Sequence, residues 1–303
     1  MTIGRQSDYM SNTTTPKTNV LEKLHKKSIS AKDIATQFWC EKQMELSYLY
    51  GFKTNKAMDK GSAIHQQMQV QVYRELTVEA VTWPDKMYKT AYENILTMGT
   101  LMEKGVAREL KIYGAINGFL VVGQIDELRM AGGKIVIVEN KTTGDRSGKM
   151  SPEYTRPHFV QALLYRKLLE ELRKQLFNFQ NLDAYYKLSL SSLSPTFIAG
   201  LKSIGVKDDL LSIKGIYTSM FEKMGRLPEL SDDVLIHYVN RSNNEVVADL
   251  TVKYERDSLN KDLIYAMKYW NGERDASPVP ETEKWKCRVC RFFGDKCLTW
   301  YQK

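Results

Sequence analysis

The sequence predicts an α/β fold, a sheet flanked by helices with a helical region before it. Three observations predict this class. Apolar residues recur at helical spacing through much of residues 30–106, the period changes to two between Arg108 and Thr143, and helical spacing returns at about residue 156. With 303 residues, of which 43% are hydrophobic, the chain can bury a sizeable core. We therefore expect one compact domain over residues 30–303, preceded by a flexible lead over residues 1–29.

The helical region should begin after Ser30, a residue type favoured at helix N-caps. The first helix covers SAKDIATQFWCEKQMELSYLYGF and ends near Gly51. A second helix starts at about Lys60, in GSAIHQQMQVQVYREL, and a third covers about residues 85–106. Cys40 then lies on or beside the first helix.

The sheet begins with a meander of three strands, divided by turns at Asn117-Gly118 and Gly132-Gly133. The following helix, over about residues 156–176, could cover the sheet with one apolar stripe. The residues of that stripe are Phe159, Leu163, Leu164, Leu168 and Leu169.

The last third of the chain is less regular. Residues 178–232 surround a helix-like SIKGIYTSMFEKM, and the pattern does not distinguish an insertion from an integral part of the core. A hairpin across Ser242-Asn243-Asn244 and a helix over about residues 256–271 should follow.

Charge and hydropathy limit the surroundings of the chain. Forty-four Lys and Arg against thirty-six Asp and Glu give a net charge of +8, which suits a polyanionic partner. No apolar run approaches the roughly 20 residues that span a bilayer, so we expect no membrane association. The expected location is intracellular, in the cytoplasm, nucleoid or nucleus. An organellar transit peptide in residues 1–29 is an alternative that Asp8 and Glu22 weaken.

Charged residues occupy the first hairpin where a strand normally carries apolar side chains. In GQIDELRMAGGKIVIVENKTT, Glu139 and Lys141 share one side of their strand and Asn140 lies on the other. Buried charges persist when they are paired or hold a metal. Two interpretations follow. One is a Glu139–Lys141 ion pair at a sheet edge, with Asp126 entering a turn; the other is a carboxylate site for Mg²⁺ or Mn²⁺ beside a catalytic lysine.

An Asp at the end of one strand followed by Glu-x-Lys at the end of the next resembles the PD-(D/E)XK nuclease superfamily, with GQID in place of Pro-Asp. The resemblance implies a restriction-endonuclease-like core, in which helices flank a mixed sheet. It also implies that Asp126 and Glu139 bind Mg or Mn, and that Lys141 orients and polarises the water that attacks phosphorus.

Two further features are similar to the RecB-type branch of that superfamily. Gln161 and Tyr165, spaced i and i+4 on one helix face, look like its Q-x-x-x-Y motif. His65 matches the helix-borne histidine that helps to ligate the metal there. By this resemblance Gln161 would position Lys141 or the substrate strand, and Tyr165 would contact the nucleic-acid backbone.

The four cysteines stand toward opposite ends of the chain. Cys40 is alone, whereas Cys287, Cys290 and Cys297 form C-x2-C-x6-C. In an intracellular protein this spacing favours a metal site over disulfides. Four thiolates suit Zn²⁺ or a [4Fe-4S] cluster, and spacing alone does not choose. Charged residues among the cysteines argue against ordinary core packing.

One Cys before the nuclease motifs and three after them is similar to the iron-sulfur nucleases, which include exonuclease V and the CRISPR-associated RecB-like nuclease. The resemblance covers about residues 30–303 and implies a single RecB-type nuclease domain. It implies that the four cysteines bind a [4Fe-4S] cluster in a C-terminal segment over residues 280–303. The RELKIYGAINGFLVVGQIDEL run and residues 178–232 favour exonuclease V.

The resemblance to exonuclease V implies a Mg- or Mn-dependent exonuclease that hydrolyses single-stranded DNA in repair or processing. A single-strand-binding protein or a helicase is the partner to expect. Backbone contacts and base stacking are expected from basic and aromatic residues: Arg146, Lys149, Arg156, Lys286, Arg288, Arg291, Phe292, Phe293 and Tyr301.

Two alternatives stay open. One is a CRISPR adaptation nuclease that trims spacers with an integrase partner. The other is a non-catalytic nucleic-acid-binding module braced by zinc. The sequence leaves open the polarity of digestion, endonuclease against exonuclease action, and DNA against RNA.

Overall fold

A computed structural model describes residues 19–51, 59–60, 63, 75–144 and 147–300. The α-helices are α1 (Val20–Lys23), α2 (Ala31–Leu49), α4 (Trp83–Lys104), α5 (Pro152–Arg173), α6 (Phe179–Tyr186), α7 (Pro195–Ser203), α8 (Ile213–Gly225) and α9 (Arg256–Trp270). The strands are β1 (Ile29–Ser30), β2 (Val106–Ile116), β3 (Phe119–Ala131), β4 (Lys134–Thr143), β5 (Asp233–Asn240) and β6 (Val246–Lys253). Short 3-10 helices are η1 (Leu188–Leu190), η2 (Asp208–Leu210) and η3 (Glu281–Val289).

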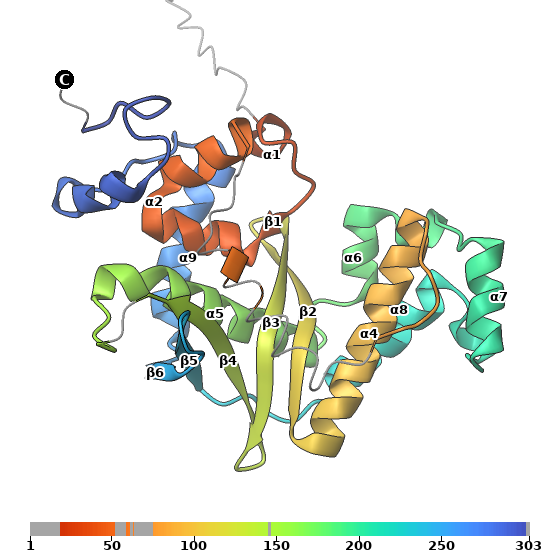
Figure 1. Ribbon diagram of the computed structural model, residues 1–303. Helices are drawn as coiled ribbons and strands as arrows, with labels where there is room; N and C mark the ends of the chain where they lie inside the picture. The colour runs from red at the N-terminus through yellow and green to blue at the C-terminus, as the bar shows by residue number, and fades with distance from the viewer. Residues whose placement is uncertain (1–18, 52–58, 61–62, 64–74, 145–146, 301–303) are drawn as a thin grey trace, which may run out of the picture.

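The six strands form one mixed sheet, as predicted (Figure 1). Strands β2, β3 and β4 are the expected antiparallel meander, and Asn117 and Gly118 make the first turn with positive φ angles of 48° and 79°. Strand β4 then pairs in parallel with β5, and β5 pairs antiparallel with β6. The hairpin predicted across residues 242–244 is confirmed.

Two strands share one side of β3. Strand β1 pairs with Val121 and Val122, and β4 pairs with β3 from Glu127 to Ala131. Residues 123–126 lie between these two ladders. Beyond Val138, β4 leaves β3 and continues alongside β5. The sheet therefore opens between β3 and β4 at the place where the charged hairpin residues lie.

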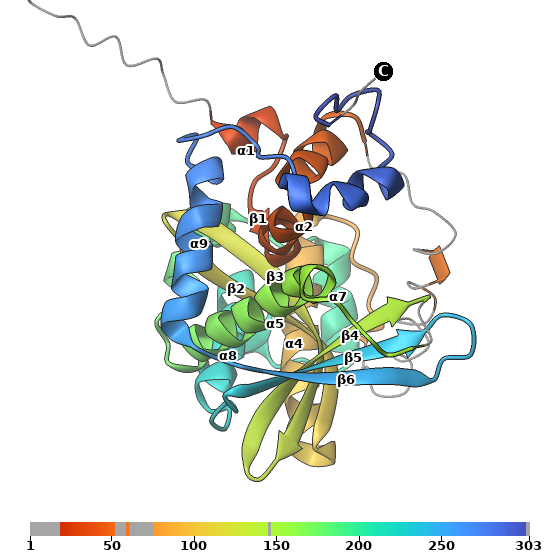
Figure 2. The same cartoon turned by 90° about the vertical axis from the view of Figure 1, so that its left-hand side faces the viewer.

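Helix α5 lies across one face of the sheet and α2 packs on α5 (Figures 1 and 2). Helix α5 begins at Pro152, before the predicted start near residue 156, because Ser151 caps the helix and Pro152 occupies its first turn. Three residues of the predicted stripe, Leu164, Leu168 and Leu169, are fully buried. Phe159 and Leu163 are partly buried and pack against the same core.

Helix α4 runs along β2, and α6, α7 and α8 gather around it to one side of the sheet (Figure 1). The Asn94 side chain binds both backbone groups of Lys111: its Nδ2 donates to the carbonyl oxygen at 2.8 Å and its Oδ1 accepts from the N–H at 3.0 Å. These bonds satisfy polar groups on the outer edge of β2. Buried side chains of α6 to α8 belong to the same hydrophobic cluster as those of the sheet.

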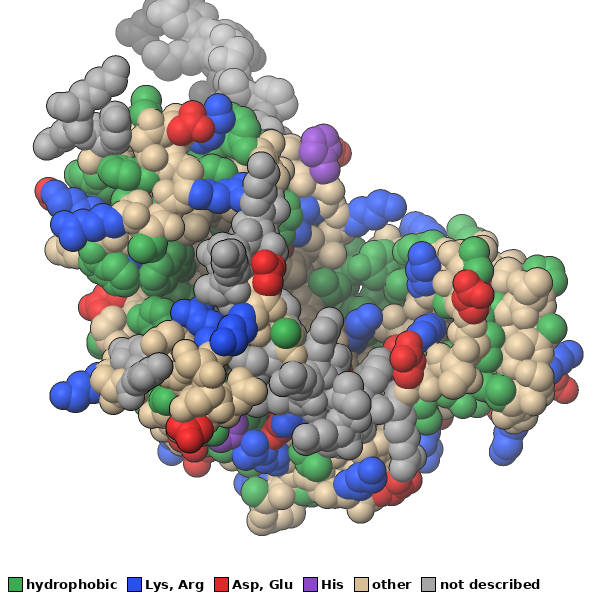
Figure 3. Space-filling model, viewed as in Figure 1, with side chains coloured by type: hydrophobic (Ala, Val, Ile, Leu, Met, Phe, Trp, Pro, Cys, Tyr) green, Lys and Arg blue, Asp and Glu red, His purple; other side chains and the backbone are tan. Residues whose placement is uncertain are grey.

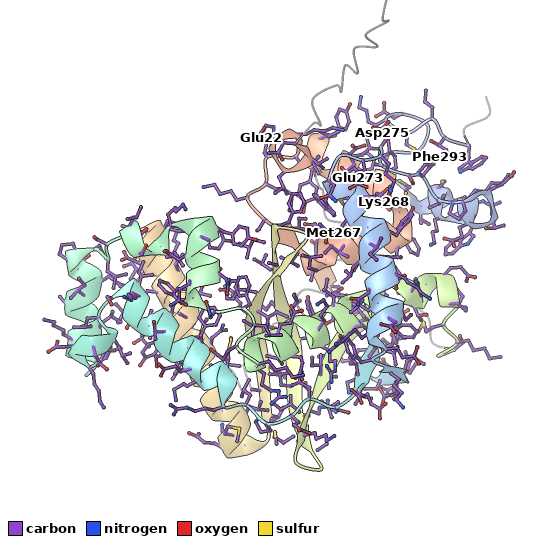
Figure 4. The ribbon with its side chains drawn as sticks, turned by 180° about the vertical axis from the view of Figure 1, so that it is seen from behind. Glu22, Met267, Lys268, Glu273, Asp275 and Phe293 are labelled. Carbon is purple, nitrogen blue, oxygen red and sulfur yellow. The ribbon has the colours of Figure 1, made fainter. Side chains whose placement is uncertain are left out.

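The C-terminal segment returns to the N-terminal helices. Figure 4 shows Glu273 and Asp275, which follow α9, at the same end of the molecule as Glu22 of α1 and Phe293. Most of the helix expected from Lys60 lies outside the described residues. None of the described helices is long and apolar enough to cross a membrane.

Candidate active site

Asp126 and Glu139 lie where β3 and β4 separate. The Asn140 N–H donates a hydrogen bond of 2.9 Å to Asp126 Oδ2, so a carboxylate replaces a strand partner at the opening. The prediction that both acids end their strands is wrong, because β3 continues to Ala131 and β4 to Thr143. They lie at the end of the β3–β4 ladder instead, a feature that hydrophobic periodicity does not reveal.

Lys141 and Glu139 form an ion pair inside the sheet. Lys141 Nζ lies 2.6 Å from Glu139 Oε1, and the Glu139 side chain is 1% exposed. The predicted ion pair is therefore confirmed, at a place where β4 pairs with β5 alone. Asp126 does not enter a turn, because β3 continues to Ala131. An ionised pair at this depth requires further hydrogen bonds.

Gln161 of α5 supplies those hydrogen bonds. Its Oε1 accepts from Lys141 Nζ at 3.0 Å, and its Nε2 donates to Glu139 Oε1 at 2.7 Å. The same Nε2 lies 2.9 Å from the Tyr165 hydroxyl. The structure thus brings Gln161 and Tyr165, predicted from their resemblance to the Q-x-x-x-Y motif, onto the predicted Glu-x-Lys pair.

Burial and neighbouring charge set the protonation of the site. Burial raises the pKa of Asp126 to about 6, although Lys141 and the Asn140 N–H lower it. Burial alone would lower the pKa of Lys141, but the Glu139 and Asp126 carboxylates outweigh burial and raise it above its usual value. Lys141 is therefore an ammonium group at neutral pH.

Glu109 is a third acidic residue near this site, and sequence reasoning missed it. Its neighbours Arg108 and Leu110 pair with Glu127 and Ile125, which places Glu109 opposite Asp126. Its φ is +62°, a left-handed conformation that is uncommon for a residue with a side chain. Its carboxylate accepts a hydrogen bond from Gln124 Nε2. Burial raises its pKa, and the charge of Glu139 adds to that rise.

The predicted metal ligands are described only in part. Asp126 and Glu139 offer adjacent hard oxygen donors, which fit Mg²⁺ or Mn²⁺, and a cation would stabilise the ionised form of Asp126. His65 lies outside the described residues. Within residues that the structure does describe, no three His, Cys, Asp or Glu side chains are gathered tightly enough to hold a metal ion.

Two grooves border the network. The first, of about 450 Å³, is lined by Lys32, Ala35, Thr36, Trp39, Gln43, Ser47, Lys141, Tyr154, Pro157, His158 and Gln161. The second, of about 430 Å³, is lined by Ser30, Lys32, Met87, Thr90, Lys111, Tyr113, Val122, Gly123, Gln124, Tyr165 and Tyr186. Both grooves are lined by aromatic rings and lysines. Figure 3 shows Lys and Arg side chains around the middle of the face of the molecule that is seen in Figure 1. Such surfaces suit a nucleic-acid strand.

Several residues expected to contact DNA have other roles. The Lys286 side chain is 2% exposed, and its Nζ lies 4.4 Å from the centre of the Trp39 ring. Phe292 is buried, so its ring is not available for base stacking. Arg291 donates to the Gly51 carbonyl oxygen and Arg156 pairs with Asp262.

The remaining residues of that set differ in exposure. Lys149 and Arg288 are exposed and Phe293 is partly exposed, whereas Arg146 and Tyr301 lie outside the described residues. The expected DNA contacts of Lys286 and Phe292 are therefore wrong, because a sequence gives the charge or ring of a side chain and not what covers it.

The four cysteines line one cavity, and none forms a disulfide. Cys40 has non-helical φ and ψ of −167° and 109°, and therefore kinks α2. The Gln43 N–H lies 3.4 Å from its sulfur. Burial raises the pKa of Cys40 to about 11 and raises that of Cys287, and the neighbouring thiols add to both. A bound cation would offset that penalty, and four thiols are the ligand set that zinc or an iron-sulfur cluster takes. In this structure the four sulfurs share a cavity but are not gathered as closely as metal ligands are.

Comparison with known proteins gives the class of protein. The family model described as "Exonuclease V - a 5' deoxyribonuclease" matches residues 19–132, 129–222 and 208–301. The chain belongs to this family, and its membership implies a deoxyribonuclease. The Exonuclease V of Danio rerio is 25% identical over 284 residues, which are 90% of this chain and 70% of that protein.

Solved structures show a weaker likeness. The crystal structure of the protein SSO0001 has a TM-score of 0.42 at 10% identity. The match covers 89% of this chain and 90% of the SSO0001 chain. A candidate exonuclease from Eubacterium rectale has a TM-score of 0.35 at 11% identity. The match covers 94% of this chain and 95% of the Eubacterium rectale chain. Neither score reaches 0.5, so the family assignment rests on the sequence matches.

Proposed function

We propose that this protein is a Mg²⁺- or Mn²⁺-dependent exonuclease with a PD-(D/E)XK core, and that it hydrolyses single-stranded DNA in repair or processing. One observation carries the proposal: Lys141 Nζ lies 2.6 Å from Glu139 and 3.0 Å from Gln161, at the strand opening that holds Asp126. The description of the family as a 5′ deoxyribonuclease supports digestion from a 5′ end.

Each residue of the network has a role in this proposal. Asp126 and Glu139, with His65, would hold the metal ion, which supplies Lewis-acid stabilisation of charge on the scissile phosphate. Lys141 orients the attacking water and stabilises the same oxygens. Gln161 holds the Lys141 ammonium toward Glu139, and the Tyr165 hydroxyl holds Gln161 in turn. The Tyr165 side chain is buried, so it would position Gln161 rather than make the DNA-backbone contact expected from the sequence.

We also propose that the cysteine cavity binds a [4Fe-4S] cluster through Cys40, Cys287, Cys290 and Cys297. Their common cavity supports this proposal. The cluster would join the two ends of the chain and act on folding rather than on the reaction. A single-strand-binding protein or a helicase as partner stays a prediction.

Lys141→Ala tests the nuclease proposal. Without the ammonium we expect cleavage of an end-labelled single strand with Mg²⁺ or Mn²⁺ to fall at least about a hundredfold, the scale of one lost transition-state contact. DNA binding and metal content at the cysteines should persist. The measurement is single-turnover cleavage, with binding followed separately by fluorescence anisotropy.

Lys134→Ala is the matched control, because Lys134 is an exposed lysine at the other end of the same strand. It should cleave like the wild type. Equal binding with and without Mg²⁺, with no cleavage by the wild type, would contradict the proposal and favour the zinc-braced binding module.

A further inference from the structure

His158 lies on α5 beside the candidate active site. It lines the first groove together with Lys141 and Gln161, and it precedes Gln161 by one helical turn. Its Nδ1 lies 2.8 Å from the hydroxyl of Tyr238 on β5. Its ring also packs edge-on against Tyr154, with ring centres 5.3 Å apart. Contacts on two sides hold the imidazole in one orientation.

The contact with Tyr238 fixes where the imidazole carries its proton. Tyr238 is 0% exposed, and a buried phenol needs an acceptor for its O–H. Among the described residues, Nδ1 of His158 is the group within hydrogen-bond distance of this hydroxyl. Nδ1 therefore accepts, and the proton of the neutral ring sits on Nε2, at the opposite edge. His158 is partly exposed and lines the groove, so this N–H is presented to the groove.

The His158 imidazole is neutral at neutral pH. Burial lowers the pKa of His158 to about 3, and the positive charge of Lys141 lowers it as well. A second cation beside Lys141 would be repelled, whereas a neutral N–H is not. A neutral donor can still make a strong hydrogen bond when the acceptor is an anionic oxygen.

We propose that His158 is a phosphate-contacting residue: its Nε2–H donates a hydrogen bond to a phosphate oxygen of the strand that lies in the first groove beside Lys141. This inference rests on the proposed nuclease function and deepens it. Lys141 attracts the phosphate by its positive charge. His158 fixes the position of one phosphate oxygen, because a hydrogen bond from a ring held in one orientation is directional. The contact would position the strand relative to the carboxylates.

The test compares His158→Phe with His158→Gln. Phe keeps the ring and removes the donor, whereas Gln keeps an N–H near the position of Nε2. With a short single-stranded DNA and no divalent ion, we expect His158→Phe to weaken binding about ten- to hundredfold, the size of one hydrogen bond to a charged group. His158→Gln should keep most of the affinity. His237→Phe is the matched control, because His237 pairs with Asp249 on β6, and it should bind like the wild type.

Two readouts separate a contact from a structural effect. Each phosphate of the DNA is replaced in turn by a neutral methylphosphonate, and the loss of affinity is measured for the wild type and for His158→Phe. At the phosphate that His158 contacts, the loss of affinity from the two changes together should be smaller than the sum of the separate losses. A structural role would leave every position additive. The slope of log affinity against log salt should also stay unchanged in His158→Phe, whereas losing a cationic contact lowers it by about one.

Each outcome decides the inference. If His158→Phe binds DNA as tightly as the wild type, or if the losses of affinity add at every phosphate, the inference is overturned. A salt slope that falls by about one in His158→Phe would show that His158 contacts the phosphate as a cation and not as a neutral donor. If His158→Phe fails to fold by its melting curve, Tyr238→Phe replaces it: the proton can then move to Nδ1, and binding should weaken, but less than expected for His158→Phe. Failure of the wild type to cleave DNA would reject the nuclease function, a result distinct from all of these.

Discussion

His158 also links the protonation of one residue to the stability of the fold. Its pKa in the folded protein is about 3, whereas an unfolded-chain histidine titrates near about 6.5. Between these values the unfolded chain binds a proton that the folded protein does not bind. His158 therefore lowers stability as the pH falls below about 6.5, by about 1.4 kcal/mol per pH unit, and has no such effect above it.

We expect His158→Gln to remove this pH dependence. From pH 7 to pH 5 the wild type should lose about 2 kcal/mol that the variant does not lose. Urea unfolding of both proteins at the two pH values measures the difference. Parallel losses in the two proteins would mean that His158 is protonated in the folded protein at pH 5.

Single residues mark the limit of what the sequence could predict. Glu139, Lys141, Gln161 and Tyr165 were predicted as one site from the resemblance to the PD-(D/E)XK nucleases, and the structure brings these four together. The i, i+2 spacing on a strand and the i, i+4 spacing on a helix place the members of each motif on one face without tertiary contacts. Glu109 was missed because its left-handed backbone interrupts the strand pattern without a glycine to mark it.

At the scale of elements, local signals predicted the meander, its turns and the approximate bounds of α2, α4, α5 and α9, but not α1, which lies in the expected flexible lead, nor α6 and α7. Three features were not predictable locally. Strand β1 is only two residues long and carries no period, α2 bends at Cys40 without proline or glycine, and the opening between β3 and β4 exists because β1 occupies the same side of β3. Each depends on contacts between distant segments, which periodicity cannot report.

Gly123 lets α5 approach β3 closely enough to build the site. A Cβ at this position would lie 2.7 Å from Tyr165 Cε1 and 3.2 Å from Ile112 Cγ1. Gly123→Ala should therefore push the Tyr165 ring outward and disturb its bond with Gln161. We expect a loss of about 1–3 kcal/mol in the free energy of unfolding, as for other overpacked sites, and a clear fall in the cleavage rate.

Gly114→Ala is the matched control, since the nearest atoms to its Cβ would belong to Leu168 and Glu171 of the same helix, with Leu168 Cδ2 at 2.5 Å. The end of a leucine side chain can move more easily than a ring, so the loss of stability should be smaller and cleavage should stay near the wild-type rate. Equal losses of cleavage in the two variants would show that the position of Tyr165 is not what matters.

At the scale of the whole molecule, α2 contacts the C-terminal segment at several places, and two of them differ in chemistry. The first is polar: the Glu41 carboxylate, which is 2% exposed, pairs with Arg274 and accepts from the Ser277 N–H at 2.7 Å. The Lys42 N–H returns a bond of 3.0 Å to the Ser277 carbonyl oxygen. The second is the cysteine cavity, at which Cys40 of α2 meets the three C-terminal cysteines.

These two attachments should fail separately. If the cavity binds a [4Fe-4S] cluster, the anaerobically purified protein contains about four irons per chain and absorbs visible light, and Cys290→Ser loses both. The variant should then expose residues 280–300 to a protease while residues 274–277 stay attached through Glu41. Limited proteolysis with mass spectrometry locates the cut, and iron analysis reports the cluster.

Glu41→Ala gives the opposite pattern. It should keep its iron, because no cysteine changes, and it should be cut near residues 271–279 since Arg274 has lost its carboxylate partner. Removing one partner of a buried pair typically costs about 3–5 kcal/mol, so its unfolding should shift strongly as well. A wild-type protein without iron, whose proteolysis pattern is unchanged in Cys290→Ser, would contradict the cluster and leave the Glu41 pair as the main attachment of the C-terminal segment.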